Sequence, residues 1–382
     1  MSAFLQQFDL GAVDRADAPT IAIKDSIDIA GYPTTAASRA LADAPPAPHH
    51  AEAVQRLLDA GWRITGKTNM HELAFGMTGI NDFSGTPLNP QDASRIPGGS
   101  SSGSASAVGL RLVDAALGTD TGGSIRGPAA CCGVIGLKPT FGRVSRQGVA
   151  PNVSTLDCVG PFARDVNTII DVMLAIDPSF QAGKARRDAS KTRVGMLGVE
   201  ADEDIARAIT EAIRRAGFDS RRVKLDFMTD AFSAGLAVIN AETWRAFGHL
   251  AESGKLGTDI ASRLRAAANT TADDLSAAEQ VRRAFTNEVD RALDACDVLV
   301  LPTMPALPIT IDSARAGTSV IGMSSLIRPF NLSGHPALTL PVPIEHSTLK
   351  AGLQIVGRKG EDETVCAVAA HIEAALAGRS SN

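Results

Sequence analysis

The chain has 382 residues, of which 44% are hydrophobic and 21% are charged. Its 37 basic and 42 acidic side chains leave a formal net charge of -5, which argues against nucleic acid or an anionic membrane as the main partner. Five cysteines at unrelated spacings favour a reducing compartment, and a run of about 18 apolar residues that would span a bilayer is missing. Residues 1–10 have neither a basic start nor an apolar run, so we expect no signal peptide and a cytoplasmic location.

The first part of the chain predicts a strand, a helix and a second strand. Residues 20–30 alternate apolar and polar side chains, which is the strand period. Residues 50–60 have the helical period and are followed by Gly61, and residues 62–65 read as a short strand. From residue 97 to residue 139 Gly, Ser and Ala dominate, which allows backbone segments to approach closely.

The second part of the chain continues this alternation after a polar surface connection at residues 181–191. The predicted elements are a strand at 193–199, a helix at 202–216, a strand at 221–227, a helix at 276–295, strands at 297–301, 337–343 and 352–356, and a helix at 361–376. Strands that alternate with helices predict an α/β sandwich, and no domain boundary is evident in residues 1–382.

Two familiar motifs match the sequence only as letter patterns. Residues 61–68 (GWRITGKT) fit the phosphate-binding loop, but that loop follows a strand and begins a helix, whereas here a helix precedes it. Residues 99–103 (GSSSG) fit the nucleophile elbow, but a polar, proline-flanked turn stands where the buried strand is required. We therefore expect neither a nucleotide site nor an α/β-hydrolase elbow.

The histidines do not indicate a catalytic or metal site either. His335, His346 and His371 are formal candidates for the base of an elbow, but none has a distinctive setting. His71 and Glu72 begin a zinc motif that lacks its second histidine. The sequence therefore predicts no metal site and no cofactor.

Several other segments share one resemblance. Lys67 follows a strand, Ser100 lies in PGGSSSGS (97–104), and Ser124 lies in GTDTGGSIR (118–126). With residues 22–28 (AIKDSID), 66–70 (GKTNM), 118–142, 329–338 and 352–357, these segments resemble the amidase signature family. The resemblance implies one large catalytic domain over residues 1–382, with a mixed β-sheet covered by helices on both faces. Residues 180–295 agree only in the order of elements and are expected to be a variable subregion that shapes the substrate pocket.

The resemblance also implies a catalytic triad. Ser124 would attack an amide carbonyl, Ser100 would relay the proton after a cis Gly99–Ser100 peptide, and Lys67 would be the final base. A serine hydroxyl needs such a base, and lysine serves only when it is neutral. Burial lowers a lysine pKa by up to about 3–5 units. Because the motif around Lys67 contains no obvious carboxylate partner, we expect its pKa to lie below the solution value.

The loop around the nucleophile supplies the supporting groups. Backbone N–H groups of Thr121, Gly122 and Gly123 are expected to form the oxyanion hole, because glycines let several donors turn toward one point. Asp120 and Arg126 flank the nucleophile and are expected to form a charge pair that fixes the loop. The alternative is that Arg126 binds a carboxylate of the substrate.

The predicted activity is hydrolysis of a small-molecule carboxamide to an acid and ammonia or an amine, through a serine acyl-enzyme. The alternative is a glutamine-hydrolysing amidotransferase subunit that works with a partner protein, because both share the catalytic core. Residues 70–76 (MHELAFG) are similar to the aryl- and indole-acetamide hydrolase branch, which favours the free enzyme and makes Phe75 a candidate substrate-binding residue. A non-catalytic binding protein is a third class, in which a serine-reactive probe would not label Ser124.

Two departures from the family pattern accompany these expectations. Ser102 stands where the family usually has a second glycine in the serine-rich loop. Only residues 1–19 precede the first predicted strand, so the helical N-terminal region common in the family is largely missing. This departure argues against the dimer contacts of the family, and a homodimer is one alternative for the oligomeric state.

Overall fold

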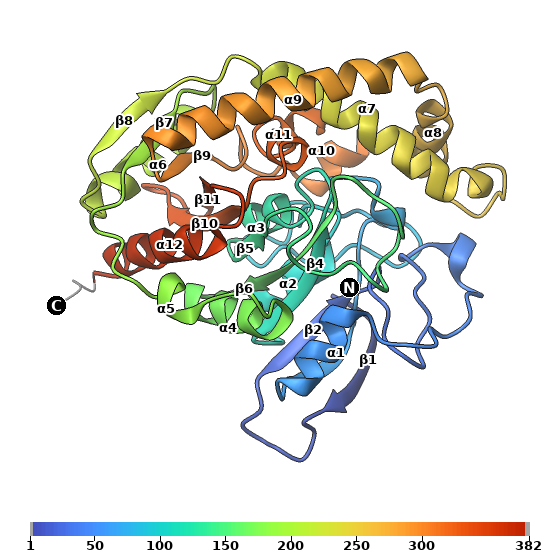
Figure 1. Cartoon of the computed structure of the whole chain (residues 1–382). Helices are drawn as coiled ribbons and strands as arrows, with labels where there is room; N and C mark the ends of the chain where they lie inside the picture. Colours follow the sequence, from blue (N-terminus) through green and yellow to red (C-terminus); the bar gives the residue numbers. More distant parts are fainter. Residues whose placement is uncertain (1–2, 379–382) are drawn as a thin grey trace.

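Eleven strands form one mixed sheet through the middle of the molecule (Figure 1). The computed structural model describes residues 3–378. The strands lie in the order β1-β3-β2-β4-β6-β5-β10-β11-β9-β7-β8. Their bounds are β1 Phe4–Gly11, β2 Thr20–Lys24, β3 Arg63–Thr68, β4 Ala115–Asp120, β5 Ile135–Lys138, β6 Cys158–Ala163, β7 Val194–Leu197, β8 Ser220–Val223, β9 Val298–Pro302, β10 Ala337–Pro343 and β11 Lys350–Gly357. The mixed α/β architecture confirms the predicted fold class.

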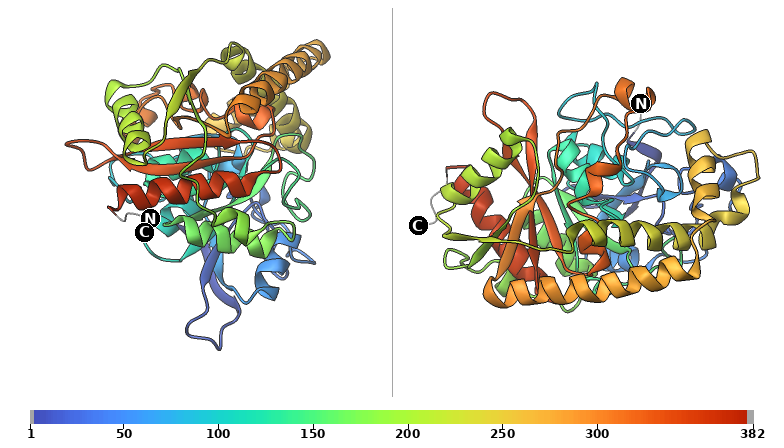
Figure 2. Two further views of the ribbon diagram at one scale, coloured as in Figure 1. Left: turned by 60° about the vertical axis from the view of Figure 1, so that its left-hand side comes forward. Right: turned by 90° about the horizontal axis from the view of Figure 1, so that it is seen from above.

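Helices cover both faces of this sheet; in Figure 2, α12 and α9 lie on opposite sides of the strands. The helices are α1 Glu52–Asp59, α2 Ser102–Gly109, α3 Arg126–Cys132, α4 Val166–Ile176, α5 Ala182–Ala185, α6 Glu203–Arg215, α7 Met228–Phe247, α8 Thr258–Ala267, α9 Ala272–Ala295, α10 Ile311–Arg315, α11 Pro329–Leu332 and α12 Asp362–Leu376. One hydrophobic cluster joins α1, α4, α6 and α12 to the sheet, and a second joins α7, α9 and α11 to it.

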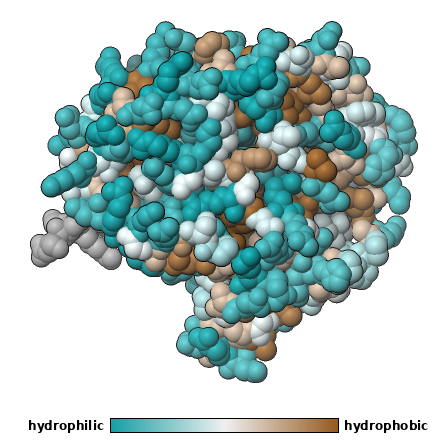
Figure 3. Space-filling view, viewed as in Figure 1, coloured by the Kyte–Doolittle hydropathy of each residue, from teal (hydrophilic) through white to brown (hydrophobic). Residues whose placement is uncertain are grey.

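Strand β9 shows how one apolar run serves both faces. Val298 and Val300 belong to the first cluster, whereas Leu299 and Leu301 belong to the second. Successive side chains of a strand point to opposite faces, so a strand covered by helices on both sides is apolar throughout. The face shown in Figure 3 is mostly hydrophilic, with hydrophobic residues scattered over it.

The parallel part of the sheet brings the carboxyl ends of three strands together. Strand β2 pairs in parallel with both β3 and β4, so the carboxyl ends of these three strands meet at one edge. The strand expected over residues 20–30 ends at Lys24, because Asp25 turns the chain by accepting hydrogen bonds from the backbone of Thr35 and Ala37. This turn leaves Lys24 as the last residue of a buried strand.

Other expected elements differ in extent. The long helix α9 starts four residues before the expected start at 276, because Thr271 and Asp274 form a capping box. The half-polar edge strand β1 and the helices α7 and α8 are not expected from the sequence pattern. Within residues 3–378, no helix combines the length and the apolar character that crossing a bilayer requires.

Candidate active site

Lys24 and Ser100 form the centre of the site. The Lys24 Nζ donates hydrogen bonds to Ser100 Oγ at 2.7 Å and to Thr119 Oγ1 at 2.8 Å. Both Lys24 and Ser100 have no solvent-exposed surface. Burial lowers the pKa of Lys24 to about 7, although the negative charges of Asp157 and Asp120 act in the opposite direction. A lysine with this pKa is substantially neutral near pH 7 and is able to accept a proton.

Lys67 lies on the other side of the sheet, which corrects the prediction that it contacts Ser100. In the parallel pairing, Lys67 stands beside Ile23, and Thr68 stands beside Lys24. Because side chains alternate between faces, Thr68 shares a face with Lys24 and Lys67 does not. The contacts agree, since Thr68 Oγ1 hydrogen-bonds to Ser104 Oγ in α2, the helix that follows the serine loop.

The ammonium group of Lys67 has its own partners. Its Nζ lies 2.9 Å from Asp25 Oδ1 and donates to the Pro33 carbonyl oxygen at 2.8 Å and to Thr34 Oγ1 at 2.9 Å. The side chains of Lys67 and Asp25 are both only 2% exposed. The expectation that Lys67 has no carboxylate partner is therefore wrong, and the ion pair ties β3 to the turn after β2.

Ser124 lies in the loop between β4 and α3, beside the serine-rich loop. The Ser101 N–H donates to the Ser124 carbonyl oxygen at 3.3 Å, and the Gly99–Ser100 peptide is cis, as the resemblance implied. Ser124 is 6% exposed. Within residues 3–378, neither its hydroxyl group nor its backbone N–H has a hydrogen-bond partner. The structure therefore brings Ser100 and Ser124 onto adjoining loops and leaves the Ser124 hydroxyl free.

The oxyanion loop needs one correction. The Gly123 N–H donates to Asp120 Oδ1 at 2.7 Å, so this expected donor is already occupied. The N–H groups of Thr121 and Gly122 have no acceptor in the part of the chain that the structure describes. Gly123 has a φ of +113°, and an added Cβ would lie 2.2 Å from Ile327 Cδ1, so only glycine fits there.

Asp120 and Arg126 form a buried ion pair behind this loop. Arg126 donates through Nε and Nη2 to the two oxygens of Asp120, both at 3.0 Å. Its other contacts are the Ile327 carbonyl, Gln354 Oε1 and Asn331 Oδ1. These contacts use all five N–H groups of the guanidinium, and the residue is fully buried. Arg126 therefore has no donor left for a substrate carboxylate, which excludes the alternative.

The segments expected to shape the pocket lie beside this loop. Ile239 of α7 is so close to Gly122 that an added Cβ would lie 2.8 Å from its Cδ1. Phe75 is 9% exposed and belongs to an apolar cluster with Phe247 at the end of α7 and Leu264 of α8. Phe75 therefore packs against the helices of the variable subregion, and its role in substrate binding stays a prediction.

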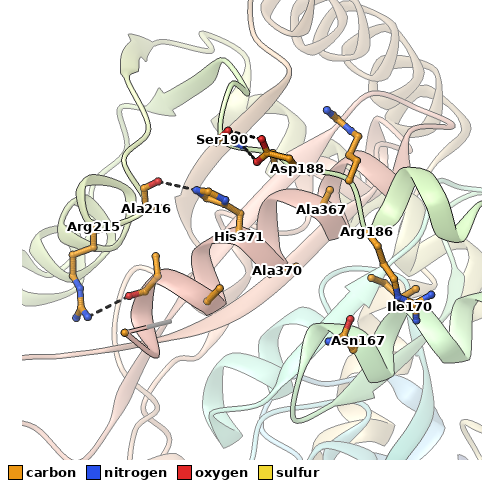
Figure 4. A pocket seen from close by; sticks show the side chains of 15 residues that line it. Asn167, Ile170, Arg186, Asp188, Ser190, Arg215, Ala216, Ala367, Ala370 and His371 are labelled. Carbon is orange, nitrogen blue, oxygen red and sulfur yellow. Dashed lines mark hydrogen bonds between the residues drawn. The ribbon is translucent and has the colours of Figure 1, made fainter. Parts of the chain in front are cut away.

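The candidate histidines lie elsewhere. His335 is buried and hydrogen-bonds to Asp290, and the side chain of His346 is 91% exposed. His371 hydrogen-bonds to the Ala216 carbonyl in a cavity of about 830 Å³, and none of the three triad candidates nor Lys24 lines that cavity (Figure 4). Among the described residues, no group of three or more His, Cys, Asp or Glu side chains is placed to hold a metal ion.

A sequence signal for Lys24 existed. Residues 21–23 are Ile, Ala and Ile, which indicates a strand buried on both faces, and lysine is rare in such a position unless it is paired or functional. A lysine at the end of such a strand is therefore a candidate base, and the register of β2 against β3 separates it from Lys67.

The site therefore contains a fully buried lysine that hydrogen-bonds to Ser100, and Ser124 on an adjoining glycine-rich loop. The family model described as Amidase matches residues 20–219 and 220–366, and the chain belongs to this family. It is accordingly a hydrolase of C–N bonds other than peptide bonds.

Known proteins similar to this chain agree with that class. It is 33% identical to a subunit of the glutamyl-tRNA(Gln) amidotransferase of Methanospirillum hungatei, over 91% of this chain and 90% of that protein. It is 32% identical to the corresponding protein of Halobacterium salinarum, over 98% of this chain and 99% of that protein. Among solved structures, the corresponding protein from Thermotoga maritima superposes with a TM-score of 0.83 at 29% identity, over 97% of this chain and 87% of that one. A structure described as an amidase superposes with a TM-score of 0.83 at 33% identity, over 94% and 84%.

Proposed function

We propose that this protein hydrolyses a carboxamide through an acyl-enzyme on Ser124, with Ser100 as the proton relay and Lys24 as the base. The observation that carries the proposal is the 2.7 Å hydrogen bond between Lys24 and Ser100 in a fully buried setting. Lys24 thereby takes the role that the sequence assigned to Lys67.

Acylation starts from neutral Lys24. Its Nζ accepts the proton of Ser100, Ser100 accepts the proton of Ser124, and the Ser124 Oγ attacks the carbonyl carbon of the amide. The N–H groups of Thr121, Gly122 and Ser124 face no competing acceptor in residues 3–378 and are assigned to the developing oxyanion. One such donor contributes about 2.7–4 kcal/mol to the transition state.

The same relay then runs in reverse. The Lys24 ammonium returns its proton through Ser100 to the nitrogen of the substrate, the C–N bond breaks, and ammonia or an amine leaves. A water molecule repeats the attack on the acyl-enzyme, again losing its proton through Ser100 to Lys24. The carboxylic acid is released and Ser124 regains its hydroxyl proton.

For the substrate, the relatives favour the amidotransferase alternative over a free aryl-amide hydrolase. Three of them are amidotransferase subunits by name, and this chain spans 90%, 99% and 87% of their lengths. We therefore place glutamine first among the amides and expect a partner protein to receive the ammonia. The free-standing enzyme is supported by residues 70–76 and by the similar structure described as an amidase.

The test is ammonia release from glutamine, indole-3-acetamide, phenylacetamide and butyramide, by the wild type and by Ser124→Ala. Wild type should release ammonia from at least one of these amides, and Ser124→Ala from none. Ammonia release by Ser124→Ala at the wild-type rate would overturn the proposal. So would wild-type protein that releases no ammonia from any of these amides and is not labelled by a serine-reactive probe. A preference for the aryl amides would instead support a free-standing aryl-amide hydrolase.

A further inference from the structure

Arg328 is a buried cation without a counterion. It directly precedes α11, is 6% exposed, and has no carboxylate oxygen within 4 Å among residues 3–378. Its Nη2 donates to Ser324 Oγ at 2.7 Å and its Nη1 to the Phe232 carbonyl at 3.4 Å, whereas its Nε has no acceptor. Three of its five N–H groups are therefore unpaired. Burial lowers the pKa of Arg328 to about 10, so it still carries its charge at neutral pH.

Other arginines with an unpaired Nε differ in this respect. Arg63 has Asp9 at 3.7 Å, and Arg282 has Glu279 at 3.0 Å. A buried charge without a partner is costly, and an arginine, unlike a lysine, does not avoid this cost by losing its proton. Arg328 is thus in a setting that calls for an anion from outside the described chain.

The side chain of Arg328 lies beside the oxyanion loop. A Cβ added to Gly122 would lie 3.6 Å from its Nε. On its other side, a Cβ added to Gly235 of α7 would lie 3.0 Å from its Cγ, so two glycines make room for it. The guanidinium is held 4.3 Å from the ring centroid of Phe232. The unpaired Nε–H group therefore lies beside Gly122, whose N–H group is assigned above to the developing oxyanion.

We propose that Arg328 binds a carboxylate on the acyl part of the substrate and so selects amides that carry a negative charge. This inference rests on the proposed function, because it places the substrate at Ser124. A carboxylate would supply the missing counterion and accept charge-assisted hydrogen bonds from the guanidinium, which are stronger than neutral ones. An uncharged amide of the same length would leave the buried charge unpaired.

The test compares two probes that differ in this charge, glutaramate and pentanamide. Their binding is measured by calorimetry to Ser124→Ala, with and without Arg328→Met. Loss of one charged hydrogen-bonding partner should weaken glutaramate binding by about 10- to 100-fold and leave pentanamide binding unchanged. Arg328→Lys keeps the positive charge but not the planar guanidinium, and should weaken glutaramate binding less than Arg328→Met does. Arg245→Met, at an exposed position of helix α7, is the matched control and should change neither probe.

Two results would overturn the inference. One is a glutaramate affinity that Arg328→Met does not change in folded protein. The other is an equal fall in kcat/KM for both probes as substrates, because Arg328 would then act on the oxyanion or on the fold. Binding to Ser124→Ala needs no turnover, so a failure there concerns Arg328 alone. A failure of the proposed function would appear separately, as absence of ammonia release by the wild type.

Discussion

Replacing Lys24 by methionine should remove the base while keeping the length of the side chain. In the folded protein, burial lowers the pKa of Lys24 from 10.5 to about 7. At about 1.4 kcal/mol per pKa unit, this difference disfavours the ammonium form by about 5 kcal/mol. The fold therefore holds, at the carboxyl end of β2, a lysine whose neutral form is abundant at neutral pH.

The assay is the pH dependence of kcat/KM for ammonia release. In the wild type, kcat/KM should rise about tenfold per pH unit below the pKa of the base and level off above about pH 7. Lys24→Met should lose nearly all activity, and its kcat/KM should no longer show this rise with pH. Lys67→Met is the matched control, because Lys67 lies on the opposite face of the sheet. The activity of this variant should rise with pH over the same range as that of the wild type.

A second readout checks the same pKa through stability. Between about pH 7 and 10.5, unfolded Lys24 binds a proton that folded Lys24 does not, so this group makes the free energy of unfolding rise with pH in that window. Lys24→Met should lack this rise in urea titrations. If kcat/KM of the wild type rises only near pH 10.5, or if the rise near pH 7 persists in Lys24→Met, Lys24 is not the base.

Three further substitutions test the surroundings of the site. Lys67→Met should lower the free energy of unfolding by about 3–5 kcal/mol, because it leaves Asp25 buried without its ion pair, and Lys67→Met with Asp25→Asn should recover part of this in urea denaturation. Gly123→Ala should lose labelling by a serine-reactive probe, because its positive φ and close neighbours exclude a Cβ; unchanged labelling would contradict the loop geometry. Arg126→Gln should lower the free energy of unfolding by about 3–5 kcal/mol at pH 7, because Arg126 holds the pKa of Asp120 well below its usual range. The loss should become smaller in acid, as Asp120 becomes protonated in the variant. A loss that does not depend on pH would contradict this.

Much of the α/β pattern was predictable from periodicity. Strand β10 and helix α12 match the expected ranges to within one residue, because each has strong apolar periodicity and clear ends. The edge strand β1 was not predictable in the same way, since polar side chains interrupt its pattern and its pairing with β3 decides its conformation. Helices α7 and α8 were not predictable either, because α7 packs mainly against α9, and α8 packs against α7 and the segment around Phe75.

The structure brings Ser100 and Ser124 onto adjoining loops, as the sequence predicts, but places Lys67 on the other face of the sheet. Ser100 and Ser124 lie in glycine-rich segments that stand out by their composition. Choosing between Lys24 and Lys67 required the register of β2 against β3, because one residue decides which face a side chain takes. The role of Gly123 likewise depended on the Asp120 carboxylate, which occupies its N–H group.

Whether Ser124 is the nucleophile can be measured by peptide mapping with mass spectrometry after reaction with a serine-reactive fluorophosphonate. We predict one adduct, on Ser124, in the wild type and none in Ser124→Ala. Lys24→Met should react far more slowly, and Lys67→Met at a rate close to the wild type where it remains folded. An adduct on Ser100 or Ser101, or labelling that Lys24→Met does not slow, would contradict the account.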